Sequence, residues 1–227
     1  MNISGFQKFS LIDYPDKISA VIFTQGCNFR CPYCHNSELF ENKQGLIDEK
    51  EILGFLETRR SQLEAVVITG GEPTLQFDFI NFLEKVNKME FLIKLDTNGT
   101  NPQIIQKALK LNLVNYIAMD IKGPINKYSE IVGAKVATKN ILKSINLIKE
   151  KAPDYEFRTT ITREQLDEVD IKAIGNIING AKKYYLQKYI FRKENKMIKN
   201  QFSSYTDEFM IEFQKMMSNH VDGCFIR

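Results

Sequence analysis

The chain has 227 residues, of which 43% are hydrophobic and 26% charged, a composition typical of a soluble globular protein with one substantial core. The net charge of +3 is the small difference between 31 basic and 28 acidic residues, so bulk charge neither requires nor excludes a nucleic-acid partner. The first residues lack the apolar segment of a leader, and the longest apolar runs are too short to span a bilayer. We therefore expect a cytoplasmic protein without membrane contact, organised as a single domain over residues 1–227.

Short apolar runs rich in β-branched residues alternate along the chain with stretches of helical periodicity. The apolar runs predict strands at residues 18–23, 65–69, 91–95, 116–121, 156–161 and 184–191, and a last short strand at 224–226. The periodic stretches predict helices at residues 79–86, 102–111, 141–148, 166–178 and 209–217. Another helix is expected to begin after Asp48, because Glu51 lies at the spacing of a capping box and an apolar stripe follows.

Strands that alternate with helices in this way predict a parallel sheet with right-handed crossovers. Six strand–helix units in a chain of this length favour an α/β fold of the partial, open (β/α)6 barrel type with parallel strands. An open doubly wound sheet has the same periodicity and stays an alternative. In both architectures the carboxyl ends of the parallel strands meet on one face, and ligands bind there.

The first predicted strand ends in a loop that carries Cys27, Cys31 and Cys34 in C-x3-C-x2-C spacing. A structural zinc ion takes four ligands, usually as two separated pairs. A [4Fe-4S] cluster suits three thiolates on one loop better, because each holds one iron and the last iron stays open to a ligand that is not protein. A Cys3His zinc site with His35 is the alternative, although Cys34 and His35 are adjacent and would reach one tetrahedral ion with difficulty. We expect His35 to pack within the loop and Cys224 to be a small core residue.

Polar motifs follow the next three predicted strands, just as the cysteine loop follows the first. These motifs are Gly70-Gly71-Glu72-Pro73, Asp96-Thr97-Asn98 and Asp120-Ile121-Lys122. Because the strand ends share one face of the fold, we expect the three motifs and the cysteine loop to form a single site. Taken singly, the glycines would indicate a strand-to-helix turn, and the aspartates would be turn or N-cap residues.

With these motifs the sequence resembles the radical S-adenosylmethionine (SAM) superfamily. The resemblance rests on the cysteine spacing, on Tyr33 just before the third cysteine, and on the Gly70-Gly71-Glu72-Pro73 motif after the next strand. Residues 10–36 are similar to the activating enzymes of glycyl-radical proteins, in particular the activating protein of anaerobic ribonucleoside-triphosphate reductase. DTNG at 96–99 and DIKG at 120–123 are similar to the same group. The resemblance extends through the fifth predicted strand, with Asp16 where similar activators usually have glycine.

The resemblance implies a [4Fe-4S] cluster on Cys27, Cys31 and Cys34, with SAM on its open iron. In this resemblance Tyr33 packs against the adenine of SAM, and the backbone of Gly70 and Gly71 approaches the cofactor closely. Glu72 contacts the amino group, and Asp96 and Asp120 contact the ribose or the amino group. Lys122 and Arg158 contact the carboxylate. Alternatively, Asp96, Thr97 and Asp120 hold a monovalent cation. The plainer interpretation of Lys122 and Arg158 is that they are solvated rim charges.

The reaction implied by the resemblance is reductive cleavage of SAM to a 5′-deoxyadenosyl radical that takes hydrogen from a glycine of a partner protein. A flavodoxin- or ferredoxin-type protein would donate the electron, and Asp13 is expected to contact the partner. One alternative is activation of another glycyl-radical enzyme, of the pyruvate formate-lyase type, and another is a purine-like or pterin-like small-molecule substrate. A third is a non-catalytic, metal-stabilised RNA-binding module on the basic stretch 182–199, and nucleic acid is the disfavoured partner.

Overall fold

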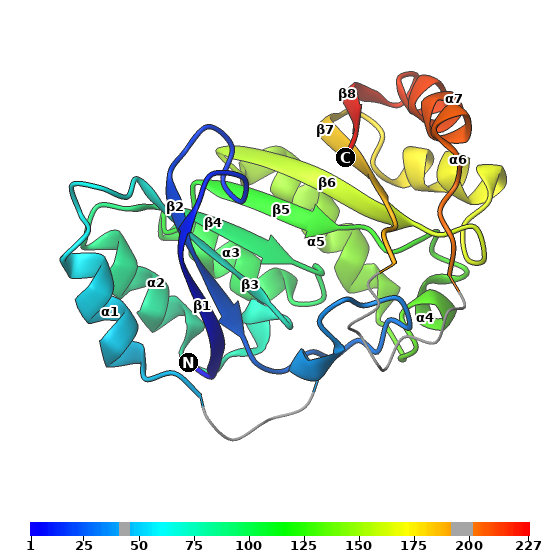
Figure 1. The fold of residues 1–227 in the computed structure, drawn as a ribbon. Coiled ribbons are helices and arrows are strands. Elements are labelled where there is room, and N and C mark those ends of the chain that lie inside the picture. Colours follow the sequence, from blue (N-terminus) through cyan, green and yellow to red (C-terminus); the bar gives the residue numbers. More distant parts are fainter. Residues whose placement is uncertain (41–45, 192–201) are drawn as a thin grey trace.

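The computed structural model describes residues 1–40, 46–191 and 202–227, and within them eight strands form one sheet in chain order. The strands are β1 (Ile3–Ser10), β2 (Ser19–Thr24), β3 (Ala65–Gly70), β4 (Leu92–Thr97), β5 (Tyr116–Asp120), β6 (Asp154–Ile161), β7 (Ala181–Lys188) and β8 (Val221–Ile226). β1 is antiparallel to β2, and every later pair of neighbours is parallel. β1 and β8 are the two edges, so the barrel is open as predicted (Figure 1).

The six predicted strand–helix units correspond to the parallel strands β2 to β7 and the helices after them. β8 is longer than the predicted short strand and starts at Val221. β1 was not predicted, because its sequence ISGFQKFS has little apolar alternation and its middle residues are partly or fully exposed. This antiparallel edge strand departs from the series of strand–helix units.

The described helices are α1 (Glu49–Glu57), α2 (Phe79–Asn87), α3 (Pro102–Lys110), α4 (Tyr128–Ile131), α5 (Thr138–Lys151), α6 (Glu168–Ile177) and α7 (Asp207–Met217), with short 3-10 turns at Ser37–Leu39 and Pro73–Leu75. Asp48 caps α1 by accepting a hydrogen bond from Lys50 N, and Pro102 lies in the first turn of α3. In α6 the side chains of Asp167 and Asp170 cap each other's backbone N–H groups in a capping box. The short helix α4 was not predicted.

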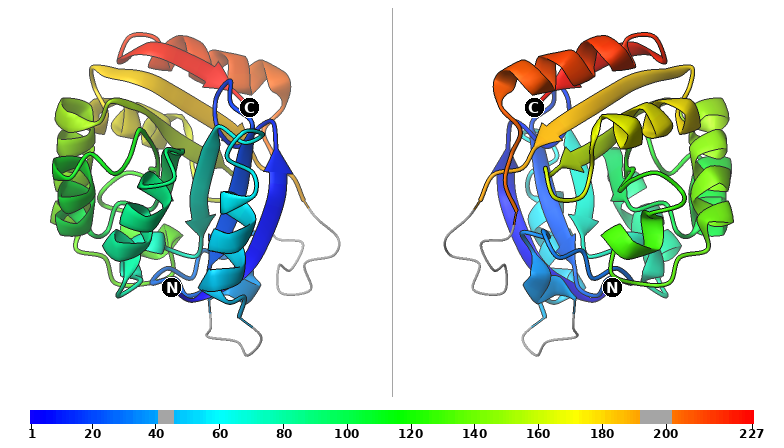
Figure 2. Two further views of the ribbon diagram at one scale, coloured as in Figure 1. Left: turned by 90° about the vertical axis from the view of Figure 1, so that its left-hand side faces the viewer. Right: turned by 90° about the vertical axis from the view of Figure 1, so that its right-hand side faces the viewer.

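The helices α1, α2, α3 and α5 lie along the outer face of the curved sheet, and the inner face is turned toward the open side (Figures 1 and 2). Successive strand residues point to opposite faces, so each strand contributes to two different environments. The outer face, together with the helices, forms the main hydrophobic core, which includes Ile22, Ile68, Ile93, Leu95, Ile117 and Met119. A small second cluster occupies the inner face and consists of Tyr14, Val21, Ala65, Val67, Tyr116 and Ala118.

Because β2 to β7 are parallel, their carboxyl ends lie at one edge of the sheet, and the cysteine loop follows β2 at that edge. The loop between β1 and β2 lies at the other end of the strands, since it precedes the first residue of β2. In that loop Asp16 has a φ of 59°, a left-handed conformation that aspartate tolerates better than most residues. Aspartate therefore serves where similar activators usually have glycine.

In the described part of the chain, each helix is too short or too polar to cross a membrane.

Candidate active site

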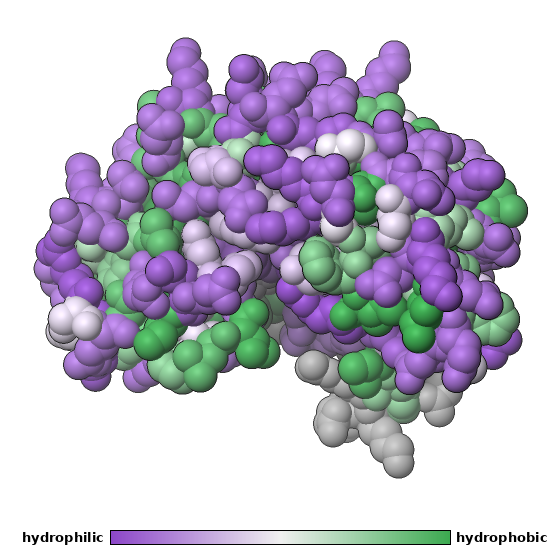
Figure 3. Space-filling view, turned by 90° about the horizontal axis from the view of Figure 1, so that it is seen from above, coloured by the Kyte–Doolittle hydropathy of each residue, from purple (hydrophilic) through white to green (hydrophobic). Residues whose placement is uncertain are grey.

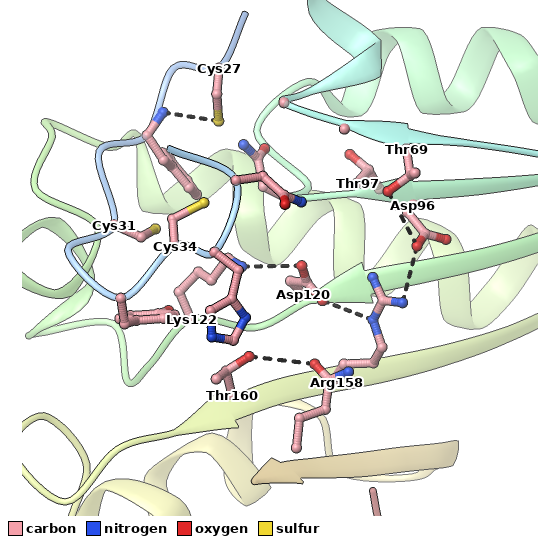
Figure 4. Close-up of a pocket in the computed structure, with 18 of the residues that line it drawn as sticks. Cys27, Cys31, Cys34, Thr69, Asp96, Thr97, Asp120, Lys122, Arg158 and Thr160 are labelled. Atoms are coloured by element: carbon pink, nitrogen blue, oxygen red, sulfur yellow. Dashed lines mark hydrogen bonds and ion pairs between the residues drawn. The ribbon is translucent and has the colours of Figure 1, made fainter. Parts of the chain in front are cut away.

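The three clustered cysteines line one cavity of about 460 Å³ at the carboxyl ends of the strands. The loop that carries them is fixed by backbone hydrogen bonds, from Gly26 N to Leu39 O at 2.8 Å and from Arg30 N to Val132 O at 2.8 Å. The Arg30 guanidinium also donates to the carbonyl of Cys27 at 2.7 Å. Figure 4 shows the three sulfurs along one side of the cavity and Asp96, Asp120 and Arg158 opposite them.

Burial raises the pKa of the Cys27 thiol to about 12 and also raises the pKa values of Cys31 and Cys34. At neutral pH these thiols are therefore protonated in the absence of metal, and binding of iron displaces their protons. This environment differs from that of a nucleophilic cysteine, whose pKa is lowered. Three thiols on one loop are a donor set that suits a metal site.

Within the described residues, no group of three or more His, Cys, Asp and Glu side chains is arranged to hold a single metal ion. A [4Fe-4S] cluster takes each thiolate on a separate iron, so three thiol donors on one loop suit its donor set. The His35 ring lies 5.4 Å from the Tyr189 ring in a stacked geometry, and its Nε2 is 2.7 Å from the carbonyl oxygen of Ile190. The donor set of the three cysteines fits a cluster. His35 packs against the residues that follow β7, and not only within its own loop as predicted.

The glycine motif after β3 clamps the start of the cysteine loop. A Cβ on Gly71 would lie 2.1 Å from the carbonyl oxygen of Gly26, and Gly70 has a φ of 111°. Gly71 N donates to Thr24 O at 2.9 Å and Glu72 N donates to Gly26 O at 2.8 Å. The close approach that these glycines allow is therefore between two backbone segments of the protein, although Gly70 and Gly71 also line the cavity.

The Glu72 carboxylate lies beneath the cavity and not in its wall. Its side chain is fully buried and accepts hydrogen bonds from Thr97 Oγ1 at 2.7 Å, from Asn98 N at 2.6 Å, and from both N and Oγ1 of Thr74. Burial raises the pKa of Glu72, and these hydrogen bonds oppose that effect. Glu72 thus holds the end of β4 against the glycine motif, and its predicted contact with an amino group stays a prediction.

A network of charged side chains forms the wall opposite the cysteines (Figure 4). Arg158 bridges the two aspartates, with Nη1 3.1 Å from Asp96 Oδ2 and Nε 2.9 Å from Asp120 Oδ1. Lys122 Nζ lies 3.1 Å from Asp120 Oδ2, and Lys94 Nζ lies 2.5 Å from Asp96 Oδ1. Strand-end motifs predicted Asp96, Asp120 and Lys122 at one site, and the family resemblance implied Arg158 there; the structure brings all four together.

The charges in this network hold one another in the ionised state. Burial by itself would raise the pKa of each aspartate, but Arg158 and the neighbouring lysines outweigh it, lowering the pKa of Asp120 to about 2 and also lowering that of Asp96. For Arg158 and Lys122, burial would lower the pKa, but the carboxylates, led by Asp120, raise it. The cavity wall therefore presents fixed charges of both signs at neutral pH.

Strand register explains why these residues meet. Asp120 of β5 is paired with Arg158 of β6, and Asp96 of β4 is paired with Ala118 of β5, two residues before Asp120. Residues two apart on a strand share a face, so the charged side chains of three adjacent strands lie on the inner face. The solvated-rim interpretation of Lys122 and Arg158 is wrong, because their side chains are 16% and 12% exposed and ion-paired.

Tyr33 and Thr97 also line the cavity. Tyr33 is 5% exposed and its ring makes an edge contact with Phe202 at 6.1 Å. Thr97 Oγ1 donates to Glu72 and accepts from Gly99 N at 3.1 Å. Both oxygens of Asp96 and of Asp120 pair with protein cations, and a monovalent cation held by Asp96, Thr97 and Asp120 stays an alternative prediction.

Sequence analysis missed several residues of the cavity wall and its support. Those in the wall are Thr69, Thr160, Gln187, Lys188 and Arg227. Asn98 Nδ2 donates to Asn28 Oδ1 at 2.9 Å and ties the end of β4 to the cysteine loop. Lys94, beneath the wall, was also missed. A polar residue at every second position of a predicted strand, as at 94 and 96 or at 156, 158 and 160, was the available signal.

The other residues that the sequence analysis singled out lie away from the cysteine loop. Asp13 accepts a hydrogen bond from Ser10 Oγ. It precedes β2, whereas the cysteines follow β2, so Asp13 lies at the opposite end of the strands from the cavity. Cys224 packs against the main core, as expected for a small core residue. In the described part of the basic stretch, Lys183 and Lys188 form ion pairs with Asp154 and Asp207. Residues 192–199 of that stretch lie outside the described residues.

Seen from above, the molecule is hollowed between the part that carries β1 and β2 and the part that carries β7 and β8 (Figure 3). Hydrophilic side chains line the bottom of this hollow, and hydrophobic ones flank it on both sides. The two edge strands contribute exposed hydrophobic residues, with Phe9 on β1 and Phe225 and Ile226 on β8. The inner face of the sheet is thus accessible from the side.

Comparison with known proteins gives consistent matches. The sequence profile of the Radical SAM superfamily matches residues 21–171. A Methanocaldococcus jannaschii protein provisionally named a glycyl-radical enzyme activating enzyme is 40% identical over 194 residues, which cover 82% of this chain and 79% of that protein. The pyruvate formate-lyase-activating enzyme of Streptococcus mutans is 32% identical over 133 residues, which cover 53% of this chain and 50% of that enzyme.

A GTP 3′,8-cyclase of Campylobacter lari is also similar, with 32% identity over 127 residues that cover 54% of this chain and 38% of the cyclase. Among solved structures, Streptococcus suis SuiB bound to S-adenosylmethionine superimposes with a TM-score of 0.64 at 17% identity, covering 91% of this chain and 49% of SuiB. That likeness concerns the fold alone.

Proposed function

This chain belongs to the radical SAM superfamily and is a relative of glycyl-radical enzyme activating enzymes, and from that premise we propose that it installs a glycyl radical on anaerobic ribonucleoside-triphosphate reductase. One observation carries the proposal. Three cysteine sulfurs on one loop and the Asp96–Arg158–Asp120 network face each other across a single cavity of about 460 Å³. The thiolates suit a [4Fe-4S] cluster. The fixed charges of both signs suit SAM, whose methionine moiety carries both an amino group and a carboxylate.

Cys27, Cys31 and Cys34 would hold a [4Fe-4S] cluster, because they fit its donor set and share the cavity wall. When bound, the cluster supplies the electron that cleaves SAM to methionine and a 5′-deoxyadenosyl radical. The protein's part is to hold these thiolates on one rigid loop, through the bonds of Gly26, Arg30 and Gly71. The same bonds keep the loop against the ends of β2 and β3.

The charged wall would orient SAM. Lys122 and Arg158 line the cavity and donate N–H groups, so they suit the carboxylate of the methionine moiety. Asp96 and Asp120 accept hydrogen bonds, so they suit the ribose hydroxyls or the amino group. Tyr33, which lines the cavity, would pack against the adenine. Because the wall is pre-formed by mutual ion pairs, little reorganisation is needed on binding.

The partner's glycine would reach the cavity from the open side of the sheet, between the two edge strands β1 and β8. Held there, the glycine Cα would give one hydrogen atom to the 5′-deoxyadenosyl radical that bound SAM would supply, which would yield 5′-deoxyadenosine and leave the unpaired electron on the glycine. A flavodoxin- or ferredoxin-type protein supplies one electron per turnover. Oxygen destroys such clusters and radicals, so we place the enzyme in the cytoplasm of cells that grow without oxygen.

The test is anaerobic reconstitution with iron and sulfide, followed by reduction and addition of SAM. We expect one 5′-deoxyadenosine and one methionine per SAM cleaved, and a glycyl-radical signal by electron paramagnetic resonance when ribonucleotide reductase is present. A reductase with its acceptor glycine changed to alanine is the matched control and should give no signal. SAM cleavage without a radical on the reductase would contradict the proposed partner and leave the radical SAM chemistry intact.

The second candidate is a small-molecule substrate, which the similarity to GTP 3′,8-cyclases favours. That similarity covers only 38% of the cyclase, against 79% of the archaeal relative, so the activating-enzyme proposal is the stronger one. A pyruvate formate-lyase type partner is the other variant, motivated by the Streptococcus mutans relative. Adding GTP or pyruvate formate-lyase in place of the reductase in the same assay distinguishes them. The membership of this chain in an enzyme superfamily argues against the non-catalytic RNA-binding module.

A further inference from the structure

The two aspartates of the cavity wall have no unpaired carboxylate oxygen. Asp96 Oδ1 is paired with Lys94 and its Oδ2 with Arg158, while Asp120 Oδ1 is paired with Arg158 and its Oδ2 with Lys122. Three cationic side chains therefore pair with these two carboxylates. Arg158 also lies 3.8 Å from Glu156 Oε1, which pairs with Arg227 as well, so the whole cluster has four cations, three carboxylates and a surplus of one positive charge. An additional metal cation would have to displace a protein cation and would be repelled by the others.

Lys94 differs from the other two cations in its position. Lys122 and Arg158 line the cavity, whereas Lys94 reaches Asp96 from beneath the wall. Its side chain is 4% exposed, and its ammonium lies 6.0 Å from the centre of the Tyr116 ring. A lysine is rarely buried to this extent unless it is paired, because removing an ammonium group from water is costly. The pairing with Asp96 is what compensates this burial.

An anionic group of a ligand in the cavity would pair with Lys122 and Arg158, which line the cavity, but not with Lys94. Lys94 would then remain as the permanent partner of Asp96. We propose that Lys94 is a built-in counter-cation that holds Asp96 ionised and aimed at the cavity, so that this enzyme binds SAM without a monovalent metal cation. This inference rests on the proposed binding of SAM in this cavity. It assigns Lys94 the role of a positioning residue.

The test compares SAM binding in three chloride salts of equal ionic strength, with potassium, sodium or tetramethylammonium as the cation. Isothermal titration of the reconstituted, unreduced protein should give wild-type dissociation constants that agree within about twofold in all three. For Lys94→Met we expect about tenfold weaker binding in tetramethylammonium, with partial recovery in potassium or sodium, because a small cation can occupy the vacated charge position. Lys94→Arg keeps the charge and should stay closer to the wild type.

Lys183→Met is the matched control. Lys183 also lies over the Tyr116 ring, at 5.4 Å, and pairs with an aspartate, but it does not line the cavity or contact Asp96. Its loss should leave SAM affinity unchanged in every salt. Equal affinity of Lys94→Met and wild type in tetramethylammonium would overturn the inference.

The wild-type protein provides a measurement that does not depend on whether the variant folds. If potassium or sodium binds the native state, the melting temperature of the protein without SAM rises with cation concentration above that in tetramethylammonium. We expect no such difference. A melting temperature that rises specifically with potassium or sodium would overturn the inference about Lys94. So would a wild-type SAM affinity that falls tenfold without these ions. Neither result would contradict the proposed function. Absence of SAM binding in all salts would instead contradict the proposed function.

Discussion

Residues of β4 alternate between the two faces of the sheet. Ile93 and Leu95 face the helices, whereas Lys94 and Asp96 face the inside of the open barrel. β6 repeats this arrangement, with Phe157 toward the helices and Arg158 toward the cavity. Both faces are largely buried, so exposure does not distinguish them. The two faces differ in chemistry: the apolar residues of the outer face stabilise the fold, and the charged residues of the inner face are available to a ligand.

The outer face gains stability from apolar burial, because each aliphatic side chain is removed from water without leaving a polar group unpaired. The inner face gains little from burying charges, since desolvation offsets most of the attraction between them. A fold that only had to be stable would do as well with apolar residues there. We therefore expect substitutions on the outer face to change unfolding, and substitutions on the inner face and its cysteine loop to change binding and chemistry.

The largest effect is expected from Cys34→Ala, which removes a thiolate from the inner side. The iron–sulfur absorbance should be lost, and SAM cleavage should fall by more than the ~10–100-fold typical of residues that only support metal ligands. Cys224→Ala is the control, because Cys224 packs against the main core away from the cavity. Visible absorption and iron analysis measure both variants. Retention of the cluster in Cys34→Ala would contradict the assignment.

Gly71→Ala tests the clamp between the glycine motif and the cysteine loop. The new Cβ would lie 2.1 Å from the carbonyl oxygen of Gly26, so backbone must move. We expect a loss of about 3 kcal/mol or more in urea unfolding of the metal-free protein. Gly54→Ala in α1 is the control, since nothing lies within 4 Å of its Cβ. That variant should be more stable by about 0.5–1 kcal/mol, and equal effects of the two changes would refute the clamp.

Ile93→Ala tests the outer face. Ile93 is completely buried against the helices, and its truncation should lower the free energy of unfolding by about 2–5 kcal/mol. The folded fraction should bind SAM with a dissociation constant within about twofold of the wild type. Val169→Ala, at a position that is 75% exposed, is the control and should change stability by less than about 0.5 kcal/mol. A large change in SAM affinity for Ile93→Ala would show that the two faces are not separable.

Asp120→Asn tests the inner face through its pH dependence and is expected to have the smallest effect on stability. The folded pKa of Asp120, about 2, lies below its ordinary value of 3.8, so the ionised carboxylate stabilises the fold above pH 4. This contribution, about 2 kcal/mol, is lost as the pH falls from about 4 to about 2. Acid unfolding of Asp120→Asn should lack this part of the pH dependence. Asp207→Asn, in an exposed ion pair with Lys188, should keep the wild-type profile.

Local sequence patterns predicted much of the fold and of the site. β-branched runs located β2 to β7, and the strand–helix alternation predicted their parallel order. The cysteine spacing and the motifs at Gly70, Asp96 and Asp120 predicted one site, and the structure places all of them on one cavity. β1 was missed because an exposed edge strand needs no apolar alternation. Lys94 was missed because polar residues at alternate positions 94 and 96 indicate a polar face but not which side chains pair on it.

The sequence by itself determined the parallel strand–helix order and the cysteine loop at the end of the first predicted strand, because both follow from residue types at short spacing. Only the tertiary structure decided which charges pair. Arg158 lies 62 residues from Asp96 in the chain and meets it through strand register, and the fully buried Glu72 is turned toward Thr97 by packing. Contacts between distant residues depend on register and close packing, which no local pattern encodes.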